Sequence, residues 1–113
     1  MAAKPRVSLV GGSGYVGGEL LRLLSGHPSL LLGQVTSERH RGERVDSVHP
    51  HLRGMTEATF VSSQDLTTCD LLILALPHGE AGVRWEEFSS LAERLIDLSA
   101  DHRLRDGGEY LRW

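Results

Sequence analysis

Five glycines gather in a short N-terminal stretch whose pattern suits the binding of a phosphate-containing ligand. The stretch, residues 7–24, reads VSLVGGSGYVGGELLRLL. Two overlapping patterns occur in it: G-x-G-x-x-G, which begins at Gly12, and G-x-x-G-x-x-G, which begins at Gly11. Glycine loses more conformational entropy on folding than other residues, so its repeated use here indicates a ligand that must approach the backbone. In such motifs the N–H groups at a helix N-terminus bind the pyrophosphate of a dinucleotide.

The surroundings of the glycines separate this interpretation from two others. A short apolar strand is expected before them and a leucine-rich helix after them, which is the context of a dinucleotide-binding motif. A P-loop is excluded, because no Gly-Lys-Ser or Gly-Lys-Thr follows the turn. The remaining alternative is a glycine turn that only packs a helix on a sheet, and such a turn would need no ligand.

The residues that follow the second expected strand bear on which dinucleotide binds. The chain reads TSERHR there, at residues 36–41. An acidic residue at this place holds the ribose 2′-hydroxyl of NAD, whereas an arginine accommodates the 2′-phosphate of NADP. Glu38 therefore favours NAD. The hydroxyl of Ser37 and the guanidinium groups of Arg39 and Arg41 favour NADP, which we expect; the alternative is that these arginines only form a solvated loop face.

The hydrophobic pattern predicts the elements that position these residues. In order, they are a strand over Arg6–Val10, a helix from Tyr15 to the stop signals Gly26 and Pro28, a strand over Leu30–Thr36, a loop over Ser37–Gly54, a weak strand over Thr59–Val61, a strand over Asp70–Leu76 that ends at Pro77, a helix over His78–Glu93 and a strand over Leu95–Leu98. The strand over 70–76 is apolar on both faces, as a central parallel strand requires. Because helices alternate with apolar strands, the sequence predicts an α/β fold with a doubly wound parallel sheet of the Rossmann type.

Composition narrows the classes of protein. Twelve Lys and Arg against fifteen Asp and Glu give a formal net charge of −3, so neither nucleic acid nor an anionic membrane is an expected partner. The only lysine is Lys4, which excludes the Tyr-x-x-x-Lys pair of short-chain reductases and epimerases. The only cysteine is Cys69, so no disulfide forms within the chain and a cytoplasmic location is expected. The sequence has neither an apolar run of membrane-spanning length nor a signal-peptide core at its start.

Four motifs in a fixed order carry a family resemblance that covers essentially the whole chain. They are GGSGYVGGELLRLLSGHP (11–28), HPHLRG (49–54), LALPHG (74–79) and DLSADHRL (97–104). Together they closely resemble N-acetyl-gamma-glutamyl-phosphate reductase of arginine biosynthesis and its sister enzyme, which reduces a carrier-bound aminoadipyl phosphate in lysine biosynthesis. The resemblance implies an NADP-dependent acyl-phosphate reductase. In that family a cysteine attacks the acyl phosphate, phosphate leaves, and hydride from NADPH reduces the thioester to a semialdehyde.

The resemblance also implies which residues bind the cofactor. Those expected to cradle the phosphates are Gly11, Ser13, Gly14, Tyr15 and Val16, and those expected at the adenosine end are Ser37 and Arg39. Those expected to border the nicotinamide are Pro77, His78 and Gly79 after one strand and Ser99, Ala100 and Asp101 after the next. Ligands of parallel α/β sheets bind outside the carboxyl ends of the strands, which independently places these segments together. Two positions depart from the family: His102 stands where an aromatic residue is common, and Glu38 where arginine is frequent.

Part of the family's machinery is expected outside this chain. In the family the nucleophilic cysteine lies in a Gly-Cys motif beyond residue 113, and an acid/base histidine comes from a second domain. We therefore expect residues 1–113 to form an NADP-binding domain, truncated before the catalytic and dimerisation domain, that binds a dinucleotide without reductase activity of its own. No catalytic and no metal-binding residue is assigned in it. The complete enzyme is expected to be a homo-oligomer that acts on a small-molecule acyl phosphate.

Three potentially reactive side chains have ordinary structural interpretations. Cys69 is expected at the start of a strand whose other end meets the cofactor, so we interpret it as a structural residue. His49 and His51 flank Pro50, but no third ligand stands at a suitable spacing. We therefore expect both histidines to be loop residues near the cofactor cleft and not metal ligands.

Alternatives to the arginine-pathway reductase stay open. The substrate can instead be the carrier-bound aminoadipyl phosphate, because the groups that recognise it are expected mostly in the second domain. Aspartate-semialdehyde dehydrogenase shares the chemistry and the fold, but the motifs at 49–54 and 74–79 point away from it. The non-enzymatic alternative is a nucleotide-binding fragment or module without catalysis.

Overall fold

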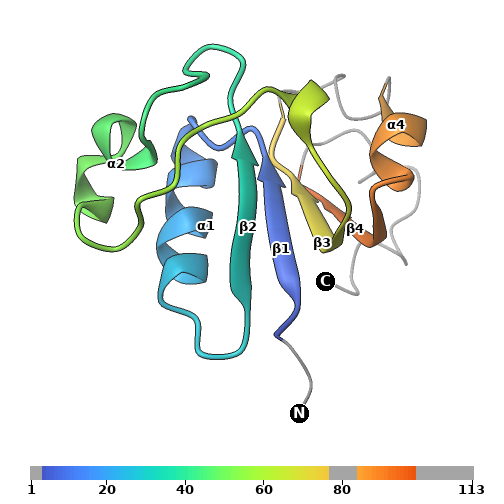
Figure 1. Cartoon of the computed structure of the whole chain (residues 1–113), viewed down its shortest axis with the longest axis horizontal. Helices are drawn as coiled ribbons and strands as arrows, with labels where there is room; N and C mark the ends of the chain where they lie inside the picture. The colour runs from blue at the N-terminus through green and yellow to red at the C-terminus, as the bar shows by residue number, and fades with distance from the viewer. Residues whose placement is uncertain (1–3, 77–83, 99–113) are drawn as a thin grey trace.

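The computed structural model describes residues 4–76 and 84–98, which form a parallel β-sheet with helices on both sides. The elements are β1 (Arg6–Val10), α1 (Tyr15–Ser25), β2 (Leu31–Thr36), α2 (Val45–Val48), the 3₁₀ turns η1 (Pro50–Leu52) and η2 (Ser63–Asp65), β3 (Cys69–Leu74), α4 (Trp85–Ser89) and β4 (Ala92–Asp97). The four strands are in the order β2-β1-β3-β4 (Figure 1). Within the described ranges, no helix is long and apolar enough to cross a membrane.

The register of the sheet aligns the carboxyl ends of its strands. Val10, the last residue of β1, is paired with Thr36 of β2 on one side and with Leu74 of β3 on the other. Leu74 is in turn paired with Asp97, the last residue of β4. All four strands therefore end along one edge, where ligands of such sheets bind.

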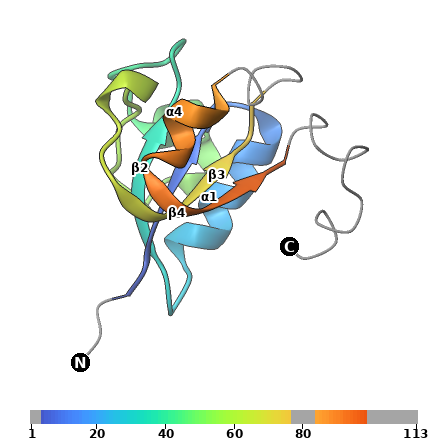
Figure 2. The same ribbon diagram turned by 90° about the vertical axis from the view of Figure 1, so that its right-hand side faces the viewer.

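Alternating side chains of the strands build a core on each face of the sheet. Val7 and Leu9 of β1 pack in one cluster with Leu21 of α1. Val10 of β1 packs in a second cluster with Phe88 of α4. Helices α1 and α4 accordingly lie on opposite sides of the sheet (Figures 1 and 2). This arrangement confirms the prediction of a doubly wound parallel sheet.

The expected elements over residues 6–36 agree closely with the structure, whereas two later parts of the chain need correction. The expected helix over 78–93 is wrong at its end, because α4 stops at Ser89 and β4 already begins at Ala92. Cys69 is paired with Ala92, so backbone pairing with β3 overrides the helical propensity of the Ala-Glu-Arg sequence. Strand β3 ends at Leu74, two residues earlier than expected, and Pro77 lies outside the described residues.

The segment expected as a loop over 37–54 contains α2 and η1, and this is the second correction. Val45 and Leu52 are fully buried in the core on the α1 side. Their burial explains the local helical structure, because both side chains must turn toward the same core. The expected weak strand over 59–61 is reduced to single bridges of Thr59 with Arg44 and of Val61 with Thr36.

Candidate functional site

A cleft with a volume of about 270 Å³ lies at the carboxyl ends of β1, β2 and β3. Its lining residues are Val10, Gly11, Ser13, Thr36, Ser37, Glu38, Arg39, Ser63, Leu76 and Arg84. Four of the residues expected to bind the cofactor, two from the glycine turn and two from the segment after β2, thus line one cleft. The parallel register produces this convergence, because it brings the ends of three strands to the same edge of the sheet.

The glycine turn is fixed to the end of β2. The Gly11 N–H donates to the Thr36 hydroxyl at 3.1 Å, and the Gly12 N–H donates to the Thr36 carbonyl at 2.8 Å. Gly11 has a φ of +89°, a conformation that side chains rarely allow. A Cβ atom at Gly11 would lie 2.5 Å from the carbonyl oxygen of Ala75. The fold alone therefore explains why this position is glycine.

Gly14 is a glycine that packing does not explain. Its backbone is extended, with φ −80° and ψ −178°, and no heavy atom lies within 4 Å of the place where a Cβ would be. It is the N-cap of α1, and no side chain caps this end of the helix. The first turn of α1 also contains no acidic residue. The N-terminal N–H groups and the positive end of the helix dipole are thus available to an anion.

Two further residues of the turn, Tyr15 and Val16, are apolar or aromatic yet exposed. The exposed fraction is 88% for Tyr15 and 53% for Val16. Both residues belong to the first turn of α1, directly after Gly14. Their backbone N–H groups, and not their side chains, are the parts that a phosphate group would contact there.

At the end of β2, Ser37 and Arg39 are the residues expected to meet the adenosine end of a dinucleotide. Ser37 is buried, and its hydroxyl oxygen accepts a hydrogen bond from the His40 N–H at 3.1 Å. A hydroxyl that accepts one bond can still donate its own hydrogen, so Ser37 retains a donor. Arg39 is exposed and lines the same cleft. A hydroxyl donor and a guanidinium group therefore converge at this end.

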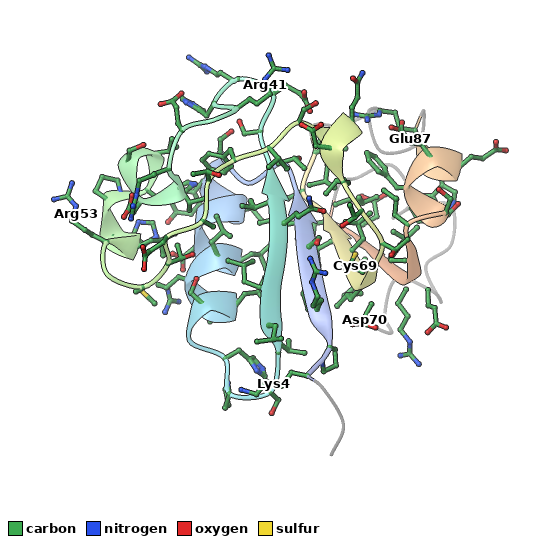
Figure 3. All side chains as sticks on the ribbon, in the orientation of Figure 1. Lys4, Arg41, Arg53, Cys69, Asp70 and Glu87 are labelled. Atoms are coloured by element: carbon green, nitrogen blue, oxygen red, sulfur yellow. The ribbon has the colours of Figure 1, made fainter. Side chains whose placement is uncertain are left out.

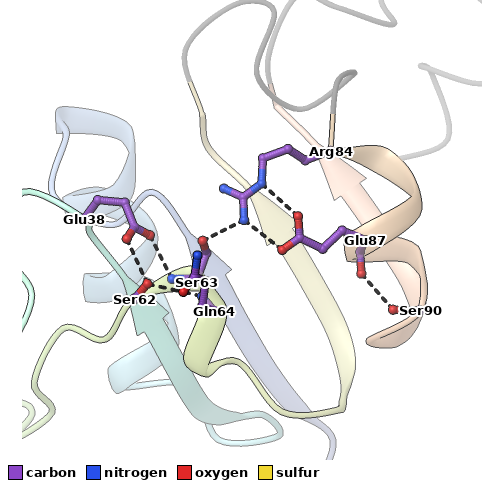
Figure 4. A network of polar contacts seen from close by, with 7 residues as sticks. All are labelled: Glu38, Ser62, Ser63, Gln64, Arg84, Glu87 and Ser90. Atoms are coloured by element: carbon purple, nitrogen blue, oxygen red, sulfur yellow. Dashed lines mark hydrogen bonds and ion pairs between the residues drawn. The ribbon is translucent and has the colours of Figure 1, made fainter.

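Glu38 contacts Ser62 and Ser63 at the start of the turn η2 (Figure 4). One carboxylate oxygen accepts from the Ser62 hydroxyl at 2.9 Å, and the other accepts from the Ser63 N–H at 2.8 Å. The hydrogen bond from the Ser63 N–H is the main reason that the pKa of the Glu38 carboxyl lies below its ordinary value, although partial desolvation opposes this. Glu38 is thus held as a carboxylate by the protein itself.

Arg84 lines the cleft from α4's side, and sequence reasoning missed it. Its Nη2 donates to the Ser63 hydroxyl at 2.7 Å, and its Nε and Nη2 donate to the two carboxylate oxygens of Glu87, both at 3.0 Å (Figure 4). The guanidinium carbon lies 4.7 Å from the centre of the Phe88 ring. No local pattern in the sequence indicates this placement, because it depends on how α4 packs against β3.

The family model described as "Semialdehyde dehydrogenase, NAD binding domain" matches residues 6–111. The chain belongs to that family. The match covers the glycine turn, the segment after β2 and both strands β3 and β4. A semialdehyde dehydrogenase NAD-binding domain is a dinucleotide-binding domain, and the cleft at the carboxyl edge of the sheet is the place that such a ligand occupies in doubly wound folds.

Curated relatives of this semialdehyde dehydrogenase domain include two groups of reductases. A protein named [LysW]-L-2-aminoadipate 6-phosphate reductase from Deinococcus radiodurans is 49% identical over 110 residues, which are 97% of this chain and 32% of that protein. A protein named N-acetyl-gamma-glutamyl-phosphate reductase from Bordetella bronchiseptica is 43% identical over 110 residues, 96% of this chain and 31% of that protein. The chain thus spans about a third of the length of these relatives. Both groups were anticipated by the motifs of the sequence.

Among solved structures, aspartate semialdehyde dehydrogenase from Candida albicans, crystallised with NADP, is similar with a TM-score of 0.72. The sequence identity is 18%, and the similarity covers 89% of this chain and 31% of that chain. At this identity the similarity establishes the fold of the semialdehyde dehydrogenase domain and nothing more specific.

In this semialdehyde dehydrogenase domain, His49 lies directly beneath the glycine turn. Its Nε2 is 2.7 Å from the carbonyl oxygen of Gly12, and the side chain is buried. A carbonyl oxygen only accepts, so Nε2 must carry a hydrogen and donate it. Gly18 makes room for the ring, since a Cβ there would lie 2.8 Å from two ring atoms. The expectation of a loop residue near the cleft understated this role, because His49 supports the turn from within the core.

Replacement of His49 by alanine is expected to destabilise the domain by about 2–4 kcal/mol, because it leaves a cavity and a buried carbonyl oxygen without a partner. Urea unfolding of the variant measures this loss. His51→Ala is the matched control, since His51 stands in the same motif but is exposed, and its expected cost is below about 1 kcal/mol. Equal losses for the two variants would contradict the supporting role of His49.

Cys69 lies at the opposite edge of the sheet from the cleft, as expected. It is the first residue of the six-residue strand β3, whose last residue ends at the cleft edge. The rise of about 3.3 Å per residue places the two ends of this strand roughly 16 Å apart. Figure 3 shows Cys69 at one end of the sheet and Arg41 beyond the other. The thiol donates a long hydrogen bond of 3.4 Å to the carbonyl oxygen of Leu71, which is consistent with a structural role.

The remaining expected site residues are not covered by the structure. Pro77, His78, Gly79, Ser99, Ala100 and Asp101 lie outside the described residues, and so does His102. Within the described part of the chain, no group of three or more His, Cys, Asp or Glu side chains could hold a metal ion.

Proposed function

We propose that the chain is the NADP-binding part of an enzyme that reduces an acyl phosphate to a semialdehyde. The observation that supports this most directly is the cleft in which the glycine turn meets the residues that follow β2. In this proposal the N–H groups at the start of α1 bind the pyrophosphate, with Gly11, Ser13, Gly14, Tyr15 and Val16 as the cradle. The open space beside Gly14 supports the proposal, because a ligand and not the fold would account for it.

We propose NADP in preference to NAD because of the groups that line the adenosine end of the cleft. Ser37 and Arg39 line the cleft and offer a hydroxyl donor and a cation to a 2′-phosphate. Glu38 is the residue that would favour NAD, but both of its carboxylate oxygens already accept hydrogen bonds from η2.

The chemistry proposed for the whole enzyme requires residues beyond those that line this cleft. NADPH, when bound, supplies the hydride. A thiolate from a second domain would attack the acyl carbon, the phosphate would leave, and transfer of the hydride to the resulting thioester would release the semialdehyde and regenerate the thiolate. Cys69 is unsuited to this step, because it lies at the opposite edge of the sheet. The proposed role of this chain is to bind the cofactor and present its nicotinamide, with the segments at 77–79 and 99–101 beside it.

Two substrates fit the proposal, an N-acetyl-gamma-glutamyl phosphate and a carrier-bound aminoadipyl phosphate. The relatives named [LysW]-L-2-aminoadipate 6-phosphate reductase, from Deinococcus radiodurans and Thermomicrobium roseum (the latter named as putative), are 49% and 50% identical. Those named N-acetyl-gamma-glutamyl-phosphate reductase are 42–43% identical. Because these identities cover only the cofactor-binding part, and the groups that recognise the substrate are expected mostly in the second domain, both substrates remain in the proposal. Assembly into a homo-oligomer and a cytoplasmic location complete the proposal.

Calorimetric titration with NADPH and NADH, followed by a turnover assay, tests the proposal. We expect the purified 113-residue chain to bind NADPH more tightly than NADH and to show no reductase activity with either acyl phosphate. The enzyme that contains this domain together with its second domain is expected to reduce one of the two. Failure of the chain to bind either nucleotide would refute the proposal, and turnover by the chain alone would refute the division of roles.

A further inference from the structure

Glu38 occupies the position at which an acidic residue selects NAD, and it lines the cleft, yet both of its carboxylate oxygens accept hydrogen bonds from the protein. In domains that select NAD, the acid after the second strand accepts a hydrogen bond from the ribose 2′-hydroxyl. Here the Ser62 hydroxyl donates to one carboxylate oxygen of Glu38 and the Ser63 N–H to the other, at 2.9 and 2.8 Å. Ser62 and Ser63 are both buried, so these donors hold the carboxylate against a fixed part of the core.

The contacts continue from Glu38 to the far wall of the cleft. Ser62 is the N-cap of η2, and its hydroxyl oxygen also accepts the Gln64 N–H at 3.2 Å, which fixes the turn. The hydroxyl of Ser63 accepts a hydrogen bond from Nη2 of Arg84 at 2.7 Å. Figure 4 shows this series of contacts crossing from the segment after β2, through η2, to the start of α4. Of the two cations that line the cleft, Arg84 belongs to this network, and Arg39 directly follows Glu38 in the chain.

We infer that Glu38 is a positioning residue that favours NADP, because it fixes η2 and through it the cationic wall of the cleft, and that it does not serve as the acceptor for the ribose 2′-hydroxyl. The inference rests on the proposed function, since it concerns the adenosine end of the same site. It assigns Glu38 the opposite effect on cofactor choice from the one that its residue type and position predict.

The positions of the cations and hydroxyl donors at the adenosine end matter more for the binding of NADP than for that of NAD. The 2′-phosphate of NADP interacts with cations and hydroxyl donors, and these interactions weaken steeply when the partners are displaced. NAD lacks the 2′-phosphate, so its binding depends less on where Arg39 and Arg84 lie. Two hydrogen bonds from Ser62 and Ser63 hold the carboxylate of Glu38, the residue directly before Arg39, against the start of η2. The Ser63 hydroxyl likewise holds the guanidinium of Arg84 at the cleft.

Titration of the Glu38→Gln variant with NADPH and NADH tests the inference, because it shows whether the preference for NADPH falls or rises. Glutamine has the same size, but it retains only one acceptor oxygen and cannot accept both bonds from η2. We expect the Kd for NADPH to rise about tenfold, as for the loss of one hydrogen bond to a charged group, and the Kd for NADH to change by less than about twofold. Glu43→Gln is the matched control, because it removes one charge from the same loop and alters only an exposed contact with His40. The control is expected to shift neither Kd by more than about twofold.

Ser62→Ala is a second variant that leaves the Glu38 carboxylate in place and removes one of its donors. It is expected to lower the preference for NADPH in the same direction, by about three- to tenfold. A rise of the NADPH preference in Glu38→Gln would identify Glu38 as the acid that selects NAD and overturn the inference. An equal weakening of NADPH and NADH, with a lower unfolding temperature, would show a merely structural role and overturn it as well. If the unmodified protein binds neither nucleotide, the proposed function fails, and this inference fails with it.

Discussion

Replacement of Gly14 by serine is expected to weaken NADPH binding by at least about tenfold while leaving the stability of the domain unchanged or slightly increased. Serine is among the best N-cap residues, and its hydroxyl accepts the N–H of the second or third helical residue. In α1 these are Val16 and Gly17, and the N–H group of Val16 is a donor for the pyrophosphate in the proposed function. The new side chain therefore satisfies the helix and competes with the ligand. It also fills the open space that Gly14 leaves beside the turn.

Calorimetric titration with NADPH and thermal unfolding, carried out on the same preparation, separate the two effects. Gly26→Ser is the control, because Gly26 ends the same helix, also has open space around it, and lies away from the cleft. We expect this variant to bind NADPH as the unmodified protein does. Undiminished binding by Gly14→Ser would mean that the glycine turn only packs a helix on the sheet, which is the interpretation without a ligand.

The parts of the fold that the sequence could predict are those governed by local patterns. Strand β1, the glycine turn and α1 follow one another within 20 residues, from 6 to 25, and each has its own signal: a β-rich apolar run, glycines and helical leucine spacing. The cofactor edge was also predictable, because parallel strands with helical crossovers must end together. The structure places Gly11, Ser13, Ser37 and Arg39 in one cleft accordingly.

The parts that could not be predicted depend on contacts between distant segments. Arg84 reaches the cleft only because Phe88 buries α4 against the sheet, and no pattern near Arg84 indicates this. The side chain of Glu38 was equally ambiguous, since its partners Ser62 and Ser63 belong to a turn that the sequence did not predict. Strand β4 begins at Ala92, earlier than the expected Leu95, because its pairing with β3 decides where it starts.

The role of His49 had a signal that a closer examination of periodicity could have found. Val45, Val48, His49 and Leu52 are spaced at i, i+3, i+4 and i+7, the pattern of one helical face. Val45 and Leu52 are buried in the core and His49 is buried with them. A histidine on an apolar face needs a hydrogen-bond partner, and the Gly12 carbonyl provides it. The low overall hydrophobicity of the segment obscured this short pattern.

Replacement of Gly11 by alanine is expected to destabilise the domain by about 2–5 kcal/mol, a large effect for a single methyl group. Two costs add at this position. The φ of +89° is unfavourable for alanine, and the new Cβ would lie 2.5 Å from the Ala75 carbonyl oxygen, which belongs to the backbone and cannot move independently. The turn must then shift, which strains its hydrogen bonds to Thr36. The free energy of unfolding in urea measures the loss, and the variant is expected to lose NADPH binding as well.

Gly42→Ala separates the cost of the positive φ from the cost of the steric clash, because only the first applies at Gly42. Gly42 has a φ of +85°, but no heavy atom lies within 4 Å of a Cβ built there. Its expected cost is therefore that of the backbone conformation alone, about 1–2 kcal/mol. The additional loss in Gly11→Ala then measures how tightly the glycine turn is fitted against the end of β3. If the two variants lose the same free energy of unfolding, the glycine turn can move away from Ala75. The cleft that this turn lines then cannot depend on a fixed turn.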